Sequence, residues 1–499
     1  MKNLIFPRKF DQEMIIEWKF WICTSVVVML IYKIFHSKYF RHVMIALRTP
    51  GPKAYPIIGN CSMARESQLT IARLTSAYKL YGPIGRMWFS FLPVFIVFKP
   101  EYLQLILGSN NHNEKSFYYK LLHNFIGDGL ITSSGEKWRK HRKFLNPIFN
   151  INIIEKFIEI FGDSAQNLIK KIKDEDETNV TTLINDGVLD ILHESVFGIP
   201  ADLNKDNSPF RQGKLVASHR VANPWLLFNS IYSMTSNASD EVKQKKRLDD
   251  FARDMIQVRR EMMKDDDIKT RKPLVDYMLE ISKNNSNFNE QDVVDEAVTF
   301  MLAGQDSVGA SLAFSIALLT KHQDHQSKCY EELNEIFGDD DRLPTMNDLR
   351  NMKHLEMCIK EALRLYPAVP LFARCLGADI KCGETILPAG CNVFIFPYAI
   401  HRLESIYPEP EKFIPERFSP EQCQDRNPYA YLPFSAGSRN CIGHRFALIE
   451  MKVVISSILR NFKLLPVPGK TSIEPVFRIT LRAHGGVWVR FEPRNNNVE

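Results

Sequence analysis

The sequence predicts a mainly α-helical protein with small β-sheets, an α+β fold built as one large domain behind an N-terminal membrane anchor. Three observations carry this prediction. Helical apolar spacing dominates between about residues 100 and 360, whereas prolines and short apolar segments cluster between 367 and 433. No linker divides this body, and an uncharged stretch over residues 20–32 stands apart from it.

Composition excludes several classes of protein. The chain has 499 residues, enough for a large packed core, and its net charge of +6 is mild for that length. A nucleic-acid binder more often shows a strong basic stripe, so we expect no nucleic-acid partner. The nine cysteines are odd in number and scattered, without a Cys-x-x-Cys pair, which indicates a reducing compartment rather than a disulfide framework.

The N-terminal stretch is predicted to anchor the chain in a membrane. The uncharged stretch 20–32 is shorter than the ~20 apolar residues that span a bilayer. The aliphatic parts of Lys19 and Lys33 can lengthen it, because their charged ends reach up to the membrane surface. A signal peptide and a core helix are the alternatives, although no small-x-small cleavage site follows. Residues 33–53 contain basic residues and no acidic one, which favours a body on the cytosolic side.

Three segments follow from this pattern. We expect the membrane anchor and its basic flank over residues 1–48 and a body over residues 61–499. Between them, residues 49–60 contain three prolines, which cannot continue a helix and which stiffen the chain. This segment is predicted to be a rigid hinge.

Local patterns predict the elements of the body in order. Residues 87–100 indicate a hairpin of two apolar strands, and residues 132–149 a basic helix with Ser134 as its N-cap. Further along, residues 382–396 indicate two strands around a Pro-Ala-Gly turn. Residues 444–462 resume helical spacing directly after the last irregular segment.

Residues 291–319 are the longest apolar helix candidate. Asp295, Glu296 and Asp306 make a membrane position costly, so we expect a buried central helix. Gly304 and Gly309 each cost about 1 kcal/mol relative to alanine in a helix interior. Such a cost usually has a packing or functional reason.

Cys441 has a setting that no other cysteine of the chain shares, between two glycines and just after an arginine. Four roles are open to its thiol: a buried structural cysteine, a zinc ligand, a nucleophile, or a thiolate ligand to haem iron. For a zinc site, His444 could be a second ligand, but no second pair of ligands is evident. For a nucleophile, His444 could be the base, but no third group that would orient it is evident. A haem ligand fits because a helix N-terminus and backbone N–H groups stabilise a thiolate.

The neighbours of Cys441 suit that fourth role. Gly437 permits a turn at positive φ, and Gly443 lets the chain approach a flat macrocycle. Arg439 can pair with a propionate carboxylate, and Phe434 can shield the sulfur from water.

This segment resembles the haem-binding loop of the cytochrome P-450 superfamily, Phe-x-x-Gly-x-Arg-x-Cys-x-Gly, at every fixed position. Further motifs follow in the family's order along nearly the whole chain. They are the proline-rich hinge at 50–59, Trp138 with Arg142, the oxygen-activation motif at 303–307, Glu361 with Arg364, and residues 415–418, which include Arg417.

The resemblance implies a role for each matching residue. Cys441 is expected to be the axial thiolate ligand to the iron of haem b. Arg374 and Arg439 are expected to contact the haem propionates, with Trp138 and Arg142 approaching from the other side. Glu361, Arg364 and Arg417 are expected to form a buried structural triad that holds the cysteine loop.

On the opposite face of the haem, the resemblance places Ala303 and Gly304 beside a groove for dioxygen. Asp306 and Ser307 are expected to relay protons there as catalytic residues. The family usually has threonine at the position of Ser307, and serine keeps the hydroxyl but loses the methyl group that fixes its rotamer.

The function that the resemblance implies is a haem-thiolate monooxygenase in the endoplasmic reticulum membrane. One atom of dioxygen would enter an apolar small molecule such as a fatty acid, terpenoid, sterol or xenobiotic. Electrons would come from NADPH through NADPH–cytochrome P-450 reductase, with cytochrome b5 as a second donor. The alternatives are a haem-thiolate isomerase or dehydratase, which needs no reductase, and a non-catalytic haem-binding protein.

The closest resemblance within the superfamily is to microsomal members of the family-4 clan, insect members in particular. Many members of that clan carry a glutamate, which can bond covalently to haem, where this chain has Ala303. Alanine cannot form that bond, so we expect no covalent haem link.

A basic cluster suits an acidic electron-donating flavoprotein. It comprises Lys137, Arg139, Lys140, Lys143 and Arg445.

Overall fold

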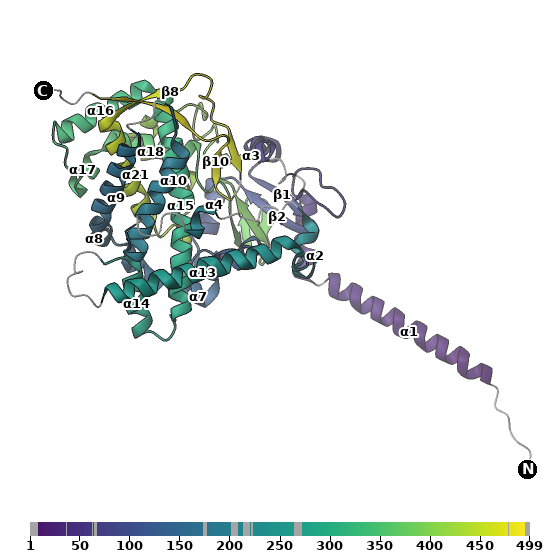
Figure 1. The fold of residues 1–499 in the computed structure, drawn as a ribbon. Coiled ribbons are helices and arrows are strands. Elements are labelled where there is room, and N and C mark those ends of the chain that lie inside the picture. Colours follow the sequence, from purple (N-terminus) through teal and green to yellow (C-terminus); the bar gives the residue numbers. More distant parts are fainter. Residues whose placement is uncertain are drawn as a thin grey trace, which may run out of the picture.

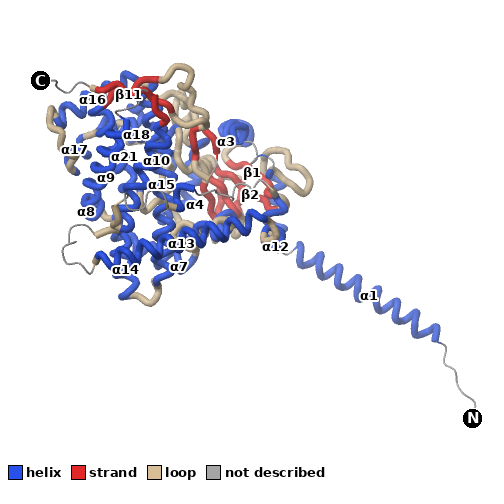
Figure 2. The backbone as a smooth tube through the Cα atoms, viewed as in Figure 1, coloured by secondary structure: helices blue, strands red, loops and turns tan. Residues whose placement is uncertain are grey.

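The computed structural model describes residues 8–35, 37–61, 63, 67–172, 177–200, 208–212, 220, 223–263, 272–477 and 479–494. It confirms the predicted mainly helical body with small sheets. One helix, α1 (Arg8–Phe35), extends away from that body (Figure 1). Strands gather in two places, one beside the base of α1 and one near the C-terminus, and helices fill the rest (Figure 2).

Helices make up most of the body. The longer ones are α2 (Lys38–Arg48), α3 (Ser67–Tyr81), α4 (Pro100–Leu107), α7 (Gly135–Leu145), α9 (Ile158–Ile172), α10 (Val180–Leu192), α13 (Ser236–Met262), α14 (Leu274–Asn284), α15 (Glu290–Lys321), α16 (Gln323–Phe337), α17 (Met346–Asn351), α18 (Lys353–Leu365) and α21 (His444–Asn461). Short helices are α5 (Phe117–Lys120), α6 (His123–Ile126), α8 (Ile151–Ile154), α12 (Asn229–Tyr232), α19 (Pro397–Ile400) and α20 (Pro420–Cys423).

Helix α15 is the central element, as the sequence predicts. It begins with a capping box in which Asn289 and Asp292 bond each other's backbone N–H groups. Helices α10, α13, α14, α18 and α21 all pack against it. Among the described residues it is the one helix long and apolar enough to cross a membrane, but most of that window is buried inside the body. It is therefore a core helix.

The largest sheet has four strands in the order β1-β2-β7-β4. β1 (Ile84–Phe89) and β2 (Leu92–Val97) form the predicted hairpin, and β7 (Asn392–Ile395) runs parallel to β2. β4 (Phe372–Cys375) pairs antiparallel with the other edge of β7. This sheet joins the N-terminal part of the body to the segment that follows α18.

Three smaller sheets complete the fold. β3 (Glu177–Asn179), β11 (Trp488–Pro493) and β8 (Phe462–Pro466) form one, in that order. β9 (Pro475–Phe477) pairs with β10 (Leu481–Ala483), and β5 (Ile380–Cys382) pairs with β6 (Thr385–Leu387). The two strands expected around the turn at 388–390 are thus present, but β6 and β7 lie in different sheets rather than pairing with each other.

The basic flank and the hinge both dock on the body. In α2, Arg41 forms an ion pair with Asp379, and Ala46 is fully buried. In the segment 49–60, the Arg86 N–H donates to the Pro50 carbonyl, and a Cβ atom at Gly51 would lie 2.2 Å from the Arg86 carbonyl oxygen. The prolines stiffen this segment, and hydrogen bonds to β1 hold it in place, so it is not a free hinge.

Candidate active site

The cysteine loop lies between the end of an irregular segment and the first turn of α21. The Cys441 N–H donates to the Phe434 carbonyl over 2.9 Å and closes the loop. Gly437 has φ +74°, and a Cβ atom there would lie 1.8 Å from the Leu107 carbonyl oxygen, so only glycine fits this position. Gly443 is the N-cap of α21. Its φ of −89° is open to any residue, so a left-handed turn is not the reason for glycine at this position.

Opposing effects act on the pKa of the Cys441 thiol. Protein surrounds the thiol and raises its pKa by burial, while the Gly443 N–H and the Arg142 guanidinium both act to lower that pKa. The residue as a whole is nevertheless exposed. A sulfur with an N–H donor, a nearby guanidinium and an open side can act as a thiolate ligand.

Arg142 binds the cysteine loop directly. Its Nη1 donates to the Asn440 carbonyl and its Nη2 to the Asn440 side-chain oxygen, both over 2.7 Å. The sequence predicts that Arg142 contacts a propionate, but the structure commits both terminal nitrogens to the residue before Cys441. Arg142 therefore fixes the loop from α7.

A cluster of buried cations lies beside the loop. Arg374 is 2% exposed, and its guanidinium donates to the Ala373 carbonyl and to Ser435 Oγ. Arg439 donates from Nη2 to the Ser133 carbonyl, whereas its Nε and Nη1 are buried and have no partner among the described residues. Within that part of the chain neither arginine forms an ion pair with a carboxylate, and Glu114 is the acidic residue whose charge acts on Arg439.

Lys115 is a third member of this cluster that the sequence analysis missed. Burial, Arg374 and Arg439 lower its pKa well below the usual value. Burial, followed by Arg374, lowers the pKa of Arg439 to about 9. A bound anion would stabilise the charged forms of these side chains and so raise their pKa values. No local motif marks Lys115, because its partners come from distant parts of the chain.

Trp138 contacts Arg439 rather than open space. The indole is 4% exposed, and the Arg439 guanidinium lies 4.0 Å from its ring centroid. The expected N-cap of this helix, Ser134, occupies the cap position, but its hydroxyl accepts from the Lys115 N–H instead of capping. Trp138 and Ser134 thus both support the cation cluster.

The middle of α15 is more open than its ends. Residues 302–307 are half-buried, whereas residues 292–301 and 308–320 are buried. Ala303 lies in this open stretch, and the Ser307 hydroxyl donates to the Ala303 carbonyl over 2.7 Å. A Cβ atom at Gly304 would lie 2.7 Å from a Leu192 methyl group, so α10 packing explains this glycine. Close packing against α10 therefore requires glycine at position 304, in addition to the expected role of leaving room for dioxygen.

Asp306 points toward the C-terminal sheet. Its carboxylate forms an ion pair with Arg482 of β10 and accepts a hydrogen bond from the Thr480 hydroxyl. The predicted relay pair is therefore split between two partners. Ser307 bonds the helix backbone, and Asp306 bonds the sheet.

The expected triad is present in the core. Arg364 donates to both Glu361 oxygens over 2.6 and 2.8 Å, and both side chains are fully buried. Arg417 Nε lies 3.5 Å from Glu361 Oε1. The same oxygen accepts the Ile414 N–H, so Glu361 binds both the helix α18 and the segment that leads to the cysteine loop.

His401 connects this triad to the cysteine loop, a link that sequence reasoning missed. Its Nδ1 lies 3.1 Å from the Arg364 carbonyl, and its Nε2 accepts the Leu432 N–H over 2.8 Å. Burial lowers the pKa of His401 to about 3. The ring is therefore neutral, with Nδ1–H donating and Nε2 accepting. Leu432 precedes Phe434 by two residues, so the triad positions the start of the loop.

Comparison with known proteins decides the family. The family model for cytochrome P450 matches residues 49–485. The chain belongs to the cytochrome P450 family. The "Probable cytochrome P450 4aa1" of Drosophila melanogaster is 51% identical over 470 residues, covering 92% of each chain. "Cytochrome P450 4c21" of Blattella germanica is 35% identical over 467 residues, covering 89% of this chain and 93% of its own.

Similarity extends beyond insects. "Cytochrome P450 4V2" of Homo sapiens is 34% identical over 469 residues and covers 89% of each chain. The fold, the resemblance to family-4 P450 proteins and the enzyme class expected from the sequence are thereby confirmed. This P450 is a haem-thiolate monooxygenase, an oxidoreductase whose family uses a haem cofactor.

The residues of this P450 fit a haem. Cys441, an exposed residue just before a helix, supplies the metal ligand, and Lys115, Arg374 and Arg439 form no ion pair with a carboxylate among the described residues, so two propionates can pair with them. The half-buried stretch 302–307 supplies an open face. Each part of the haem thus has a complementary group in the protein.

The basic cluster of this P450 is smaller than the sequence suggests. Lys137 forms ion pairs with Asp128 and Asp292, and Lys140 pairs with Glu136. Their charges are therefore balanced locally. Arg139, Lys143 and Arg445 are exposed, and no ion pair involves them within the described residues.

Proposed function

We propose that Cys441 is the axial thiolate ligand of haem b, and that the enzyme inserts one atom of dioxygen into an apolar small molecule. The substrate class is a fatty acid, terpenoid, sterol or xenobiotic. One observation carries this proposal: the exposed residue Cys441 lies just before α21, in a loop with Arg439, a buried cation that forms no ion pair within the described residues. When bound, a thiolate-ligated haem supplies activation of dioxygen, because the thiolate favours cleavage of the O–O bond.

The protein's part in this reaction begins with binding. Arg374, Arg439 and Lys115 hold the propionates, and Trp138 keeps the Arg439 guanidinium in place. Arg142 and Gly437 set the shape of the cysteine loop, and Phe434 and Gly443 border the sulfur. These residues orient the cofactor and exclude water from its thiolate side.

On the other side, Ala303 and Gly304 leave room next to the haem plane, and Ser307 and Asp306 deliver protons. The Ser307 hydroxyl can turn from the Ala303 carbonyl and donate toward the open face of α15. Asp306, held by Arg482 and Thr480, relays protons from solvent to this hydroxyl. Ala303 leaves the haem without a covalent link to the protein.

Glu361, Arg364 and Arg417 are assigned a structural role. They lie in the core and bind segments on both sides of the cysteine loop, directly or through His401. Their function is to assemble a loop that accepts haem, rather than to touch substrate.

The proposed location is the endoplasmic reticulum membrane, with the catalytic body on the cytosolic side. Helix α1 has 28 residues, about 42 Å at 1.5 Å per residue, which exceeds the ~30 Å hydrocarbon core. Its apolar stretch Trp18–Met29 is largely exposed, as a lipid-facing surface must be. The three segments 1–48, 49–60 and 61–499 serve as anchor with flank, connector and catalytic domain.

Electrons are proposed to come from NADPH through NADPH–cytochrome P-450 reductase, with cytochrome b5 as a second donor. Arg139, Lys143 and Arg445 provide exposed positive charge near the cysteine loop for an acidic partner. Charge-to-alanine substitution of these three residues should slow reduction by the reductase and weaken its salt dependence.

The experiment that tests the proposed function is reconstitution of the full-length protein with reductase, NADPH and a panel of apolar substrates. Spectral shifts of the haem identify binders, and product analysis identifies the oxidised carbon. Product formation that requires NADPH and reductase supports a monooxygenase. Rearrangement of a peroxide without reductase would assign the isomerase or dehydratase reaction instead. Binding without any product would leave a haem-binding protein.

A further inference from the structure

A second cluster of metal-ligating side chains lies between α16 and α18, on elements outside the proposed haem site. His325 and Cys329 are four residues apart on α16, and His354 and Cys358 are four apart on α18. Residues at that spacing share one face of a helix. The two helices pack against each other, so both pairs face the same interface.

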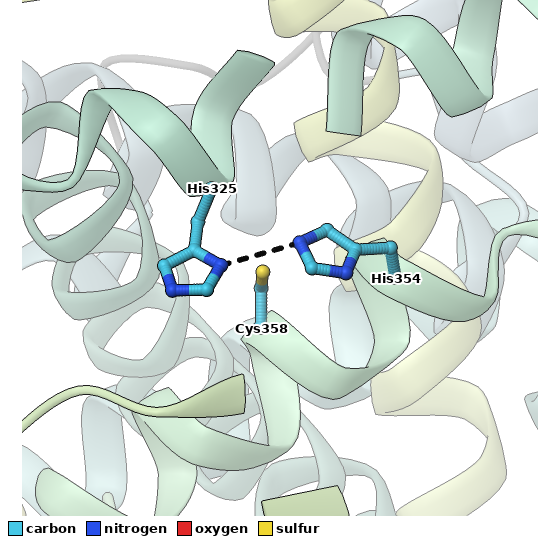
Figure 3. Close-up of side chains that lie close together, drawn as sticks. All are labelled: His325, His354 and Cys358. Atoms are coloured by element: carbon cyan, nitrogen blue, oxygen red, sulfur yellow. Dashed lines mark hydrogen bonds between the residues drawn. The ribbon is translucent and has the colours of Figure 1, made fainter. Parts of the chain in front are cut away.

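The side chains converge on one point. Figure 3 shows the two imidazole rings facing each other, with the Cys358 sulfur beside the line that joins them. Nδ1 of His325, Nε2 of His354 and Sγ of Cys358 all lie within 4.8 Å of one another. Sγ of Cys329 lies 3.7 Å from Sγ of Cys358.

Two of the separations between these atoms match a tetrahedral zinc site. Zinc binds histidine nitrogen at about 2.0–2.1 Å and cysteine sulfur at about 2.3 Å, so two nitrogens lie about 3.4 Å apart and two sulfurs about 3.8 Å apart. The observed His325–His354 N···N distance is 3.4 Å and the Cys329–Cys358 S···S distance is 3.7 Å. A disulfide would need the sulfurs at about 2.0 Å, so the thiols are free.

The surroundings also suit a structural metal. Cys329, Cys358 and His325 are buried and His354 is half-buried, which leaves one edge for entry. The other nitrogen of His325 lies 3.6 Å from an Asp324 oxygen, the kind of outer carboxylate that orients a ligating histidine. The Glu332 carboxylate accepts a hydrogen bond from the backbone N–H of His354 over 2.6 Å and so holds the start of α18.

We propose that His325, His354 and Cys358 bind a structural zinc ion that clamps α16 to α18, and that Cys329, whose sulfur lies 3.7 Å from that of Cys358, turns to supply the fourth ligand. Two thiolates balance the charge of Zn²⁺, so the filled site is neutral inside the body. Binding releases the two thiol protons to solvent. Helix α18 carries Glu361 about one turn and Arg364 nearly two turns beyond Cys358, so the clamp stiffens the helix that holds the triad.

The test is the zinc content of untagged, full-length holoprotein after dialysis against excess zinc and removal of loosely bound metal. We expect about one zinc per haem, and zinc-edge X-ray absorption that shows two sulfur and two nitrogen neighbours, a signal separate from haem iron. Cys358→Ser and His354→Gln should each lose most of the zinc. Cys61→Ser, a matched buried cysteine outside the cluster, should keep it.

Haem content reports whether each variant has folded, and His354→Gln carries the test if Cys358→Ser fails to fold, because His354 is half-buried. Wild-type protein with less than about a tenth of a zinc per haem would overturn the site. So would zinc retained by both ligand variants, a coordination shell without sulfur, or a disulfide between Cys329 and Cys358. Failure of this site would leave the haem assignment untouched, since the two share no ligand.

Discussion

Asp306 of the central helix forms an ion pair with Arg482 of β10, so the acid of the oxygen-activation motif is tied to the C-terminal two-stranded sheet. The neighbouring hydroxyl of Ser307 instead donates to the Ala303 carbonyl. The ion pair orients the Asp306 carboxylate toward β10. The proton delivery proposed for Asp306 would therefore depend on the position of β10.

Replacing Asp306 by asparagine should lower product formation tenfold or more, roughly the contribution of one acid–base group, while haem content holds. Arg482→Ala removes the partner but keeps the carboxyl, so we expect a loss of only a few-fold. The measurement is product formed per NADPH with a substrate from the panel. Equal losses in the two variants would reduce Asp306 to a structural ion pair.

Ser307→Ala should increase hydrogen peroxide released per NADPH several-fold, because the hydroxyl that donates protons on this face is gone. Ser307→Thr restores the hydroxyl and adds a methyl group that restricts its rotamers, so coupling should equal or exceed that of the wild type. Peroxide and product are measured in the same reaction. Wild-type coupling in Ser307→Ala would exclude this hydroxyl from proton delivery.

Arg439→Met should act in opposite directions on the apoprotein and on haem binding. Without haem, removing a buried cation whose Nε and Nη1 have no partner raises the melting temperature of the apoprotein. With haem, the same change removes a propionate partner and increases haem loss. Arg445→Met, at an exposed position close by, should change neither. A destabilised apoprotein with unchanged haem retention would contradict the proposed contact.

His401 should make stability depend on acid. Its folded pKa of about 3 lies below the ordinary value of 6.5, so the unfolded chain binds the extra proton first. Stability is full above about pH 6.5 and falls as pH drops toward 3, by up to roughly 1.4 kcal/mol per pH unit. Urea unfolding at several pH values compares the wild type with His401→Gln. An identical slope in both would assign the acid sensitivity to other groups.

Breaking the buried triad should prevent stable haem incorporation. Glu361→Gln leaves Arg364 without its charge partner, which costs roughly 3–5 kcal/mol for a fully buried pair. Glu409→Gln breaks the exposed pair with Lys412 and should cost under about 1 kcal/mol. Haem per protein and the urea midpoint measure both. Normal haem content in Glu361→Gln would show that the triad is dispensable.

The sequence predicted the site best where one short segment carries the chemistry. The positive φ of Gly437, the start of α21 after Cys441 and the Glu361–Arg364 pair all follow from local spacing. Contacts between distant segments could not be predicted in this way. Lys115 and His401 were missed because their partners lie on other elements.

Some residues of the motifs have partners that spacing does not reveal. Arg142 binds Asn440 rather than standing free for a propionate, and Gly304 faces Leu192. Two strands were expected around the turn at 388–390, but the pairing of β7 is set by the four-stranded sheet. A motif specifies which residues occur together along the chain, whereas packing decides which atoms meet.

The most direct test of the central claim is the absorption spectrum of the reduced, CO-bound protein. With Cys441 as a thiolate ligand, we predict the long-wavelength Soret band of a thiolate-ligated haem, the band from which the family takes its name. Cys441→Ala should abolish that band, and Cys423→Ala should keep it. A wild-type band at the position of histidine-ligated haem, or an unchanged band in Cys441→Ala, would contradict the assignment of Cys441 to the iron.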